Sequence, residues 1–207
     1  MIEDYFANLN RHIHVSRETY DKLQKYHDLL IKWQAKINLV SNDSLDQAWT
    51  RHFLDSLQLM KFIPNLSDIM IDFGSGAGFP GMVLAICGAE KMNLIESDSR
   101  KAAFLREVTR VTNTNVAIHN CRIENLKFSQ KAKIIVSRAC SNLDTLLNYS
   151  FPYVSHETIC LFPKGKNYSK DIDDANEHWM FSHTIIPSVT DSEGVILKLT
   201  DIEKRGI

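Results

Sequence analysis

The sequence predicts an α/β protein built on a doubly wound, mostly parallel seven-stranded sheet, preceded by a helical extension. Three observations support this. Residues 1–64 carry apolar side chains at helical spacing, residues 65–207 alternate short apolar runs with helical stretches, and four of the eight glycines stand within residues 74–81. Strands and helices that take turns along a chain are typical of parallel sheets covered by helices. We therefore expect a helical extension over 1–64 and one compact core over 65–207.

Composition excludes several classes of protein. The formal net charge is −1, so any contact with nucleic acid must come from a local basic patch. The four cysteines form no C-x-x-C pair and we recognise no signal peptide in the sequence, so we expect reduced thiols in a cytoplasmic protein. The longest aliphatic run, 82–87, is much shorter than the roughly 20 residues of a membrane span. We expect neither a membrane segment nor a bound metal.

Two helices are predicted in the extension. In the first, Ser16 is a suitable N-cap, and a stripe of apolar residues follows on one face: Tyr20, Leu23, Tyr26, Leu30, Trp33 and Ile37. The second is predicted to begin at Ser44, because Ser44 and Gln47 have the spacing of a capping box. Pro64 closes this region.

Seven apolar runs after Pro64 predict the strands. They cover residues 69–73, 92–96, 115–119, 134–137, 158–162, 184–187 and 195–199. Helices are predicted near 81–87, 99–112 and 141–149. The order of these elements is that of repeated strand–helix units, and ligands of such sheets bind beyond the carboxyl ends of the strands.

The turn after the first strand is the clearest ligand-binding signal. Asp72 ends the strand, and Gly74, Gly76 and Gly78 follow at alternate positions. Glycines allow a sharp turn and a close backbone approach to a ligand, and Pro80 suits the first position of the next helix. The free N–H groups at that helix start are expected to face the ligand.

Two classes of ligand fit this turn. Residues 76–81 match G-x-G-x-x-G, which indicates a nicotinamide or flavin dinucleotide, although this match alone is weak. The alternative is S-adenosylmethionine, which carries an adenosine and a cationic sulfonium but no pyrophosphate. Asp72 suits that cation, and Glu96 at the end of the second strand can hold ribose hydroxyls. We favour S-adenosylmethionine, because about seventy residues precede the turn, whereas dinucleotide folds usually begin near it.

Longer motifs point to a known family. They are KINLVS at 36–41, RHFLDSL at 51–57, DFGSGAGFPG at 72–81, SRA at 137–139 and PKGK at 163–166. With these motifs the chain resembles, over nearly its whole length, the glucose-inhibited division protein B family. Members are bacterial methyltransferases that modify N7 of a guanine in small-subunit ribosomal RNA. The resemblance implies a class I methyltransferase fold and, as substrate, guanosine 527 in the 530 loop of 16S ribosomal RNA, free or in the small subunit.

The resemblance also implies a set of site residues. Gly74 and Phe79 fall on cofactor-contacting positions, Ile123 and Glu124 on the segment that holds the adenine, and Arg138 on a position beside the methyl donor. At the end of an apolar strand, the guanidinium of Arg138 could hold a phosphate or a guanine edge. We therefore predict that Arg138 positions the substrate and contacts the cofactor, and we expect no general base.

Basic residues at the predicted ends of elements form a candidate RNA surface. They are Arg51, His52, Arg100, Lys101, Arg122, Lys164 and Lys166. Arg11, His12, His14 and Arg17 could extend it.

The methylated atom is constrained by what the sequence lacks. An exocyclic amine would usually call for an Asp/Asn-Pro-Pro-Tyr/Phe motif after the fourth strand, where this chain has SRAC. A pyrimidine C5 would need a nucleophilic cysteine, and we interpret Cys140 instead as a small buried hydrophobic residue. Guanine N7 needs neither, because its lone pair is unprotonated and nucleophilic at neutral pH.

These patterns favour an S-adenosylmethionine-dependent methyltransferase, which we expect to be a monomer, and the resemblance implies that it acts on guanine N7 of 16S ribosomal RNA. Two alternatives stay open at this level. One is a nicotinamide- or flavin-dependent oxidoreductase with a Rossmann fold. The other is an RNA-binding module that keeps the cofactor fold without turnover.

Overall fold

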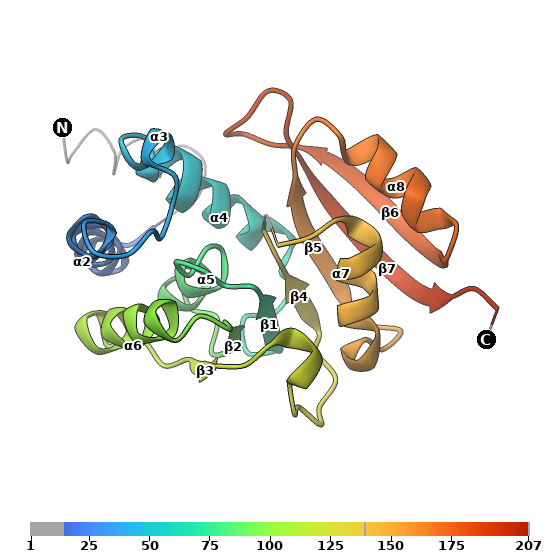
Figure 1. Cartoon of the computed structure of the whole chain (residues 1–207), viewed down its shortest axis with the longest axis horizontal. Coiled ribbons are helices and arrows are strands. Elements are labelled where there is room, and N and C mark those ends of the chain that lie inside the picture. Colours follow the sequence, from blue (N-terminus) through green and yellow to red (C-terminus); the bar gives the residue numbers. More distant parts are fainter. Residues whose placement is uncertain (1–14, 139, 207) are drawn as a thin grey trace.

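The computed structural model of the chain describes residues 15–138 and 140–206. Arg11, His12 and His14 of the possible basic extension, and the alanine of the SRA motif, lie outside the described residues. The described chain forms a central sheet with helices on both faces, and the N-terminal helices lie at one end of it (Figure 1).

The sheet has seven strands in the order β3-β2-β1-β4-β5-β7-β6. The strands are β1 (Ile69–Phe73), β2 (Lys91–Ile95), β3 (Ala117–His119), β4 (Ile134–Val136), β5 (Ile159–Lys164), β6 (Trp179–Pro187) and β7 (Val195–Lys204). The first five are parallel, and β7 pairs antiparallel with both β5 and β6. This arrangement confirms the predicted fold class. Its consequence is that β1, β4 and β5 end side by side at one edge, below the loops that follow them.

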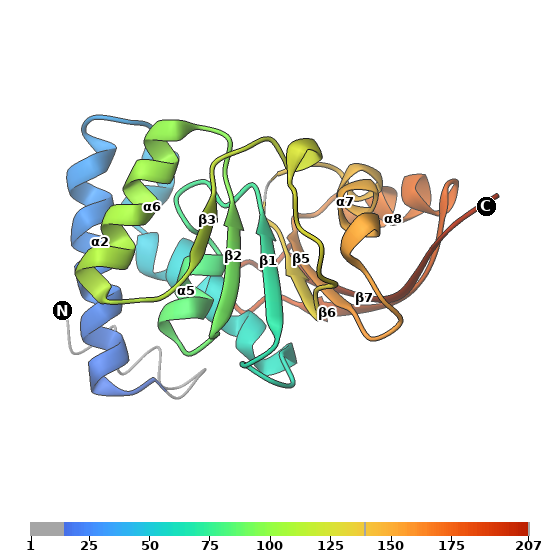
Figure 2. The same cartoon turned by 90° about the horizontal axis from the view of Figure 1, so that it is seen from below.

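Residues of β1 alternate between two hydrophobic cores. Met70 packs into the core below α5 (Gly81–Ile86), α6 (Ser99–Thr112) and the N-terminal helices, whereas Ile71 and Phe73 pack on the opposite face, below α7 (Leu143–Ser150) and α8 (Tyr168–Asn176). Figure 2 shows α2, α6 and α5 beside β3, β2 and β1, with α7 and α8 beyond β5. Because side chains alternate along a strand, Asp72 points to the α5 side with Met70.

The first predicted helix is confirmed as α2 (Arg17–Gln34), and the Ser16 hydroxyl accepts the Thr19 amide at 3.1 Å. Ile37 lies beyond its end. The Tyr26 hydroxyl donates to the carbonyl of Ala77, and its ring stacks on Phe79 at 5.3 Å between centroids. The extension thereby packs directly on the glycine turn, within the same hydrophobic core as α5 and α6.

The second predicted helix is wrong at its start. Ser41 is the N-cap residue of a short helix, α3 (Asn42–Leu45), and Ser44 lies inside it. The Ser44 hydroxyl is not a cap, because it donates to the Ser41 carbonyl at 2.8 Å and lies 2.9 Å from the His52 ring. A π-helical turn, η1 (Trp49–Leu54), then continues into α4 (Asp55–Leu57) and a 3-10 turn, η2 (Gln58–Phe62), before Pro64.

Three other elements differ from the prediction, two of them near the C-terminal end. The helix α8 was not predicted, because only two of its side chains, Ile172 and Ala175, are buried and the apolar period is therefore weak. Strand β6 begins at Trp179 and not at residue 184, since most of this edge strand is exposed and carries polar residues. Helix α5 begins at Gly81, so that Pro80 is its N-cap residue and not its first helical residue.

Candidate active site

The glycine turn bends the chain sharply between β1 and α5. Gly74, Gly76 and Gly78 all have positive φ, at 66°, 57° and 96°, where other residues are strained. A Cβ on Gly74 would lie 2.6 Å from Sγ of Cys140, and one on Gly78 would lie 2.5 Å from the Tyr26 hydroxyl. Gly74 and Gly76 line the cleft described below, whereas Gly78 is buried against α2 and serves packing.

Asp72 is fully buried below this turn. Its Oδ2 accepts the N–H of Gly81 at 3.1 Å, so the first amide of α5 is bound by the protein itself and does not face a ligand, contrary to our expectation. Its Oδ1 is buried without a hydrogen-bond partner among the described residues. Burial raises the pKa of the Asp72 carboxyl to about 7. A buried acceptor left without a donor below the glycine turn is compatible with a cationic ligand bound nearby, although Asp72 itself does not line the cleft described below.

Glu96 connects the ends of two neighbouring strands. Its Oε2 accepts the N–H of Gly76 and its Oε1 accepts the N–H of Asp98, both at 2.7 Å. These two bonds fix a carboxylate at the edge of the glycine turn. Carboxylate oxygens can accept more than one hydrogen bond, so Glu96 retains the capacity to accept ribose hydroxyls.

A cleft of about 780 Å³ opens beyond the carboxyl ends of β1, β4 and β5. This volume lies within the usual range for ligand sites, roughly 300–1,000 Å³. Of the predicted site residues, the cleft brings together Arg51, His52, Gly74, Gly76, Phe79, Lys101, Arg138 and Lys164. Segments from both halves of the chain therefore form one site.

Arg138 is held in a fixed position at the centre of this cleft. Its Nη1 donates to the carbonyl of Arg51 at 2.7 Å and to Oδ2 of Asp55 at 3.1 Å. Its guanidinium also lies over the ring of Phe79, 5.2 Å from the centroid. The side chain is only 18% exposed, so Arg138 is a positioned cation and not a freely solvated one.

His52 differs from the exposed cation that we expected. The residue is buried, with 8% of its surface exposed, and its ring stacks on Phe79 at 4.9 Å between centroids. Burial, with a further contribution from Arg138, lowers the pKa of His52 to about 3. Because a guanidinium can only donate, Nδ1 accepts from Arg138 at 3.0 Å and Nε2–H donates to Ser44 Oγ at 2.9 Å. His52 is a neutral link in a chain of hydrogen bonds.

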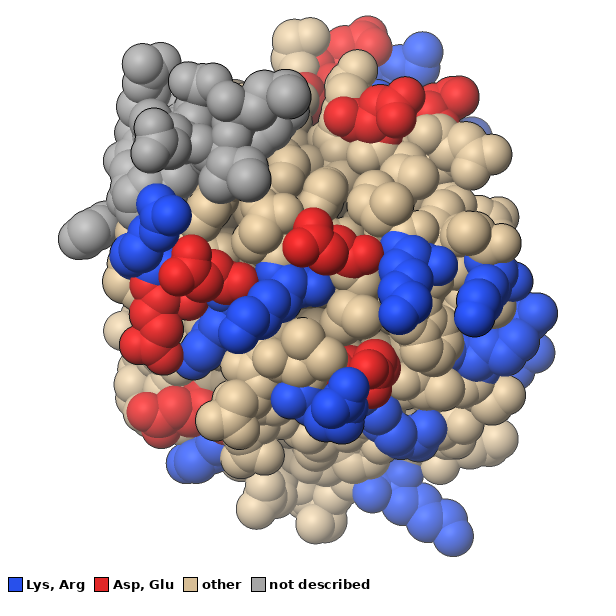
Figure 3. Space-filling model, turned by 90° about the vertical axis from the view of Figure 1, so that its left-hand side faces the viewer, with Lys and Arg blue, Asp and Glu red and all other residues tan. Residues whose placement is uncertain are grey.

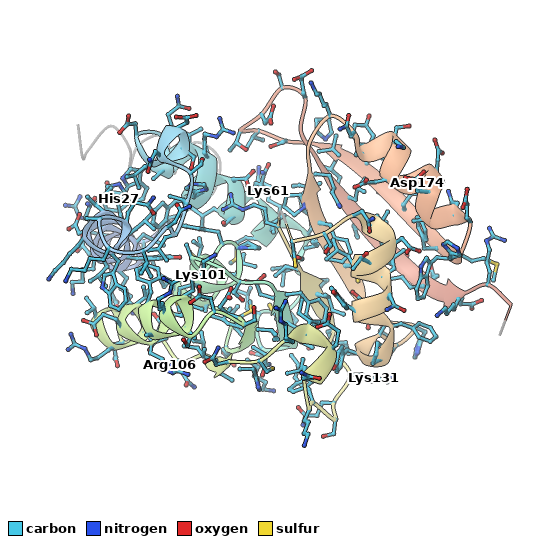
Figure 4. All side chains as sticks on the ribbon, in the orientation of Figure 1. His27, Lys61, Lys101, Arg106, Lys131 and Asp174 are labelled. Atoms are coloured by element: carbon cyan, nitrogen blue, oxygen red, sulfur yellow. The ribbon has the colours of Figure 1, made fainter. Side chains whose placement is uncertain are left out.

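The predicted basic surface is only partly assembled. Lys164, which we expected in the RNA surface, has a side chain that is only 11% exposed and is paired with Asp171 at 2.8 Å. Lys166 is exposed, and Arg100 pairs with Asp98 at 3.0 Å on the surface. Lys101 lies on the side of α6 that faces the N-terminal helices, whereas Arg106 points outward (Figure 4). Arg122 is exposed and does not line the cleft.

The face formed by α2 and α6 carries no continuous basic surface among the described residues. Lys and Arg side chains alternate there with Asp and Glu (Figure 3). Pairs such as Lys22 with Glu18 and Arg110 with Glu107 account for part of this pattern. The cleft side of the molecule is therefore the better candidate for an RNA-contacting surface.

Several predicted cofactor-binding positions do not line the cleft: Asp72, Gly78, Glu96, Ile123 and Glu124. Ile123 and Glu124 form the turn η3 (Ile123–Asn125), and Glu124 accepts the hydroxyl of Tyr149 at 3.0 Å. Cys140 is half-buried and not buried as expected, and its thiol lies close to Gly74. Desolvation raises the pKa of this thiol, which disfavours the nucleophilic thiolate.

Several residues of the site were not selected from the sequence. Asp55 lies within the RHFLDSL motif, and that motif was its only signal. The loop between β6 and β7, residues 188–194, also lines the cleft, but its composition of Ser, Thr, Asp and Gly reads only as a turn. No group of three or more potential metal ligands occurs among the described residues, and no described helix has the length and apolar character needed to span a membrane.

Comparison with known sequences gives a consistent result. The family model of GidB, described as rRNA small subunit methyltransferase G, matches residues 19–199. The ribosomal RNA small subunit methyltransferase G of Paramagnetospirillum magneticum is 45% identical over 190 residues, 92% of each chain. That of Orientia tsutsugamushi (strain Boryong) is 42% identical over 199 residues, 96% of this chain and 99% of the relative.

Solved structures share the fold. The ribosomal protein L11 methylase of Lactobacillus delbrueckii subsp. bulgaricus has a TM-score of 0.59 at 11% identity, covering 71% of this chain and 76% of its own. TYW2 of P. horikoshii, solved with MeSAdo, has a TM-score of 0.59 at 14% identity, covering 81% of this chain and 65% of its own. At these identities the likeness concerns the fold alone.

Proposed function

The chain belongs to the rRNA small subunit methyltransferase G family, and on that premise we propose that it transfers a methyl group from S-adenosylmethionine to N7 of a guanosine in 16S ribosomal RNA. The target nucleoside, by resemblance, is guanosine 527 of the 530 loop. The main structural support for this proposal is that the glycine turn after β1 and the hydrogen-bonded Arg138 after β4 line the same cleft.

The residues present fit the cofactor. The unpartnered Oδ1 of Asp72 is a buried acceptor below the glycine turn, and Glu96 presents an ordered carboxylate at its edge. We propose that Asp72, Gly74, Gly76 and Glu96 hold S-adenosylmethionine, with Phe79 packing beside it and Gly78 shaping the turn from below. Ile123 and Glu124 are proposed to contact its adenine. When bound, the cofactor supplies an activated methyl group on a cationic sulfur.

The protein contributes position and not acid–base chemistry. Guanine N7 carries a free lone pair at neutral pH, so no group is needed to remove a proton from it. Holding the two reactants in line is therefore the main source of rate enhancement. We propose that Arg138 holds the target nucleotide at the cofactor side of the cleft. The target base has to leave its stack, at a cost of about a few kcal/mol.

RNA recognition is proposed to use the basic groups near the cleft. Arg51, Lys101 and Lys166 are the best placed, with Arg100 and Arg122 further out. Lys164, being paired with Asp171, is proposed to support the loop after β5 and not to bind phosphate directly. We propose a monomer, which sedimentation analysis would test. The cytoplasmic location stays a prediction.

The direct test is transfer of tritium from labelled S-adenosylmethionine to 16S ribosomal RNA, followed by chain cleavage at N7-methylguanosine. We expect incorporation at one site with either a transcript or isolated small subunits as substrate. RNA binding without incorporation would support the alternative of a module without turnover. Thermal protection by a flavin or nicotinamide coenzyme, and none by S-adenosylhomocysteine, would contradict the proposal and favour an oxidoreductase.

A further inference from the structure

Asp55 uses both carboxylate oxygens to connect distant parts of the cleft. Its Oδ2 accepts from Arg138 at 3.1 Å, and its Oδ1 accepts from the Thr190 hydroxyl at 2.7 Å. The Nε2 of Gln58 donates to the same Oδ1 at 2.9 Å. Arg138 and Thr190 are 83 and 135 residues away from Asp55 in the chain. One side chain thus joins the loop after β4 to the loop between β6 and β7.

Gln58 adds a second attachment for the same loop. Its side chain is 2% exposed, its Oε1 accepts the N–H of Val189 at 3.0 Å, and its Nε2 donates to the Ser188 hydroxyl at 3.2 Å. Buried amides keep their hydrogen bonds because leaving them unsatisfied costs about 1–3 kcal/mol. The first part of the loop, residues 188–190, is therefore attached to α4 and η2.

The contacts to Arg138 come from the junction of η1 and α4. The Arg51 carbonyl and the His52 ring of η1 and the carboxylate of Asp55, the first residue of α4, all lie within hydrogen-bond distance of the guanidinium. Asp55 stands at the edge of this group, within reach of Thr190. The Arg138–Asp55 pair is 18% and 14% exposed, so solvent screens it only in part.

We propose that Asp55 is a positioning residue that sets two walls of the methyl-transfer cleft together, Arg138 on one side and the 188–194 loop on the other. This rests on the proposed function, because it assigns the loop to the wall that meets the target nucleoside. Ser188, Thr190, Asp191, Ser192 and Gly194 all line the cleft, and residues 188–194 include no basic residue. The loop thus suits the neutral base and ribose better than phosphate.

The test compares Thr190→Val with Thr190→Ser. Serine keeps the hydroxyl that donates to Asp55, and valine removes it. We expect Thr190→Val to lower kcat/KM for 16S ribosomal RNA about fivefold or more, with Thr190→Ser close to the unchanged protein. Asp55→Asn is expected to lower kcat/KM at least about tenfold, because an amide cannot accept from both partners as a carboxylate does. The affinity for S-adenosylhomocysteine, measured by calorimetry, should stay within about twofold for all three.

A matched control is Glu107→Gln, which breaks a surface pair on α6 at 2.7 Å, away from the cleft. Its kcat/KM should not change. Coupling is read from a double-mutant cycle: Thr190→Val and Arg138→Lys together should deviate from additivity by about threefold or more in kcat/KM. In the Asp55→Asn background the same two changes should become additive.

Amide hydrogen exchange supplies a readout that does not depend on methyl transfer. In Asp55→Asn and Thr190→Val, the amides of residues 188–194 should exchange at least about fivefold faster, and in Thr190→Ser they should not. Equal behaviour of the two Thr190 variants in exchange and in kcat/KM would overturn the coupling role, even if Asp55→Asn failed to fold. A wild-type protein that does not methylate RNA would instead contradict the proposed function, independently of the hydrogen-exchange result.

Discussion

Nη2 of Arg138 lies 3.0 Å from Nδ1 of His52, a residue 86 positions earlier in the chain. The contact places a permanent cation against a neutral imidazole, and it fixes the tautomer of the ring. His52 passes the chain of hydrogen bonds on to Ser44, whose hydroxyl donates to the Ser41 carbonyl. The orientation of Arg138 therefore depends on the N-terminal extension.

His52→Asn and His52→Leu should separate this role from simple packing. The Asn oxygen can take the place of Nδ1 and accept from Arg138, whereas Leu leaves the guanidinium without that acceptor. We expect Asn to retain activity within about threefold and Leu to lose about tenfold or more in methyl incorporation. Exposed His156→Asn is the control. Equal losses in Asn and Leu would show that only the ring stacking on Phe79 matters.

Arg138→Lys keeps the charge but not the geometry. A lysine ammonium cannot hold the Arg51 carbonyl, the Asp55 carboxylate and the His52 ring at once in one plane. We expect methyl incorporation to fall at least about tenfold, while thermal protection by S-adenosylhomocysteine is kept. Full activity in this variant would reduce Arg138 to a surface charge.

Asp72→Asn should change how stability depends on pH. Burial raises the folded-state pKa of Asp72 to about 7, above its unfolded value, so the folded state holds the proton more tightly. The contribution of Asp72 to stability is therefore present below about pH 4 and is lost as the pH rises through 7. The difference in unfolding free energy, wild type minus Asp72→Asn, should decrease from pH 5 to pH 7 by at most about 1.4 kcal/mol per pH unit.

Urea unfolding across that range measures this difference, with Asp173→Asn on the exposed face of α8 as the surface control. A constant difference between the unchanged protein and Asp72→Asn would contradict the assignment. S-adenosylhomocysteine has to be absent from these experiments, because ligand binding adds its own pH dependence.

Gly74→Ala tests the glycine turn. The φ of Gly74 is 66°, and an added Cβ would meet the thiol of Cys140 at 2.6 Å. We expect a loss of about 1–2 kcal/mol of stability from the backbone alone and a measurable weakening of S-adenosylhomocysteine binding in calorimetry. Gly165→Ala, where a Cβ has no neighbour within 4 Å, should do neither. Unaltered binding in Gly74→Ala would mean that the turn does not approach the cofactor.

Lys166→Gln and Lys164→Gln should have different effects. Lys166 is exposed, so removing its charge should weaken RNA binding and reduce the salt dependence of the affinity by about one released ion. Lys164 is bound to Asp171 and to the Ser141 carbonyl, so its replacement should lower the melting temperature and leave the salt dependence unchanged. Filter binding at several salt concentrations measures both. A reduced salt dependence in Lys164→Gln, with an unchanged melting temperature, would indicate that Lys164 contacts phosphate.

Several features were predictable because their signals are local. Strand β1 was predicted with its bounds, and so was α6, because each has a strong apolar period within one short segment. The glycine turn was equally clear, since alternate glycines after an apolar strand have few other uses. Boundaries failed where burial is one-sided or weak, as in β6 and α8.

The sequence by itself determined the succession of the seven strands along the chain, the ligand-binding turn and the family, because these depend on spacing and motif within neighbouring residues. Only the tertiary structure decided that His52 is a neutral, buried link, that Lys164 is paired, and that Asp55 joins Arg138 to the 188–194 loop. The physical reason is that charge state and hydrogen bonding depend on burial and on the partners that folding brings together, which for His52 and Asp55 include Arg138, more than eighty residues away.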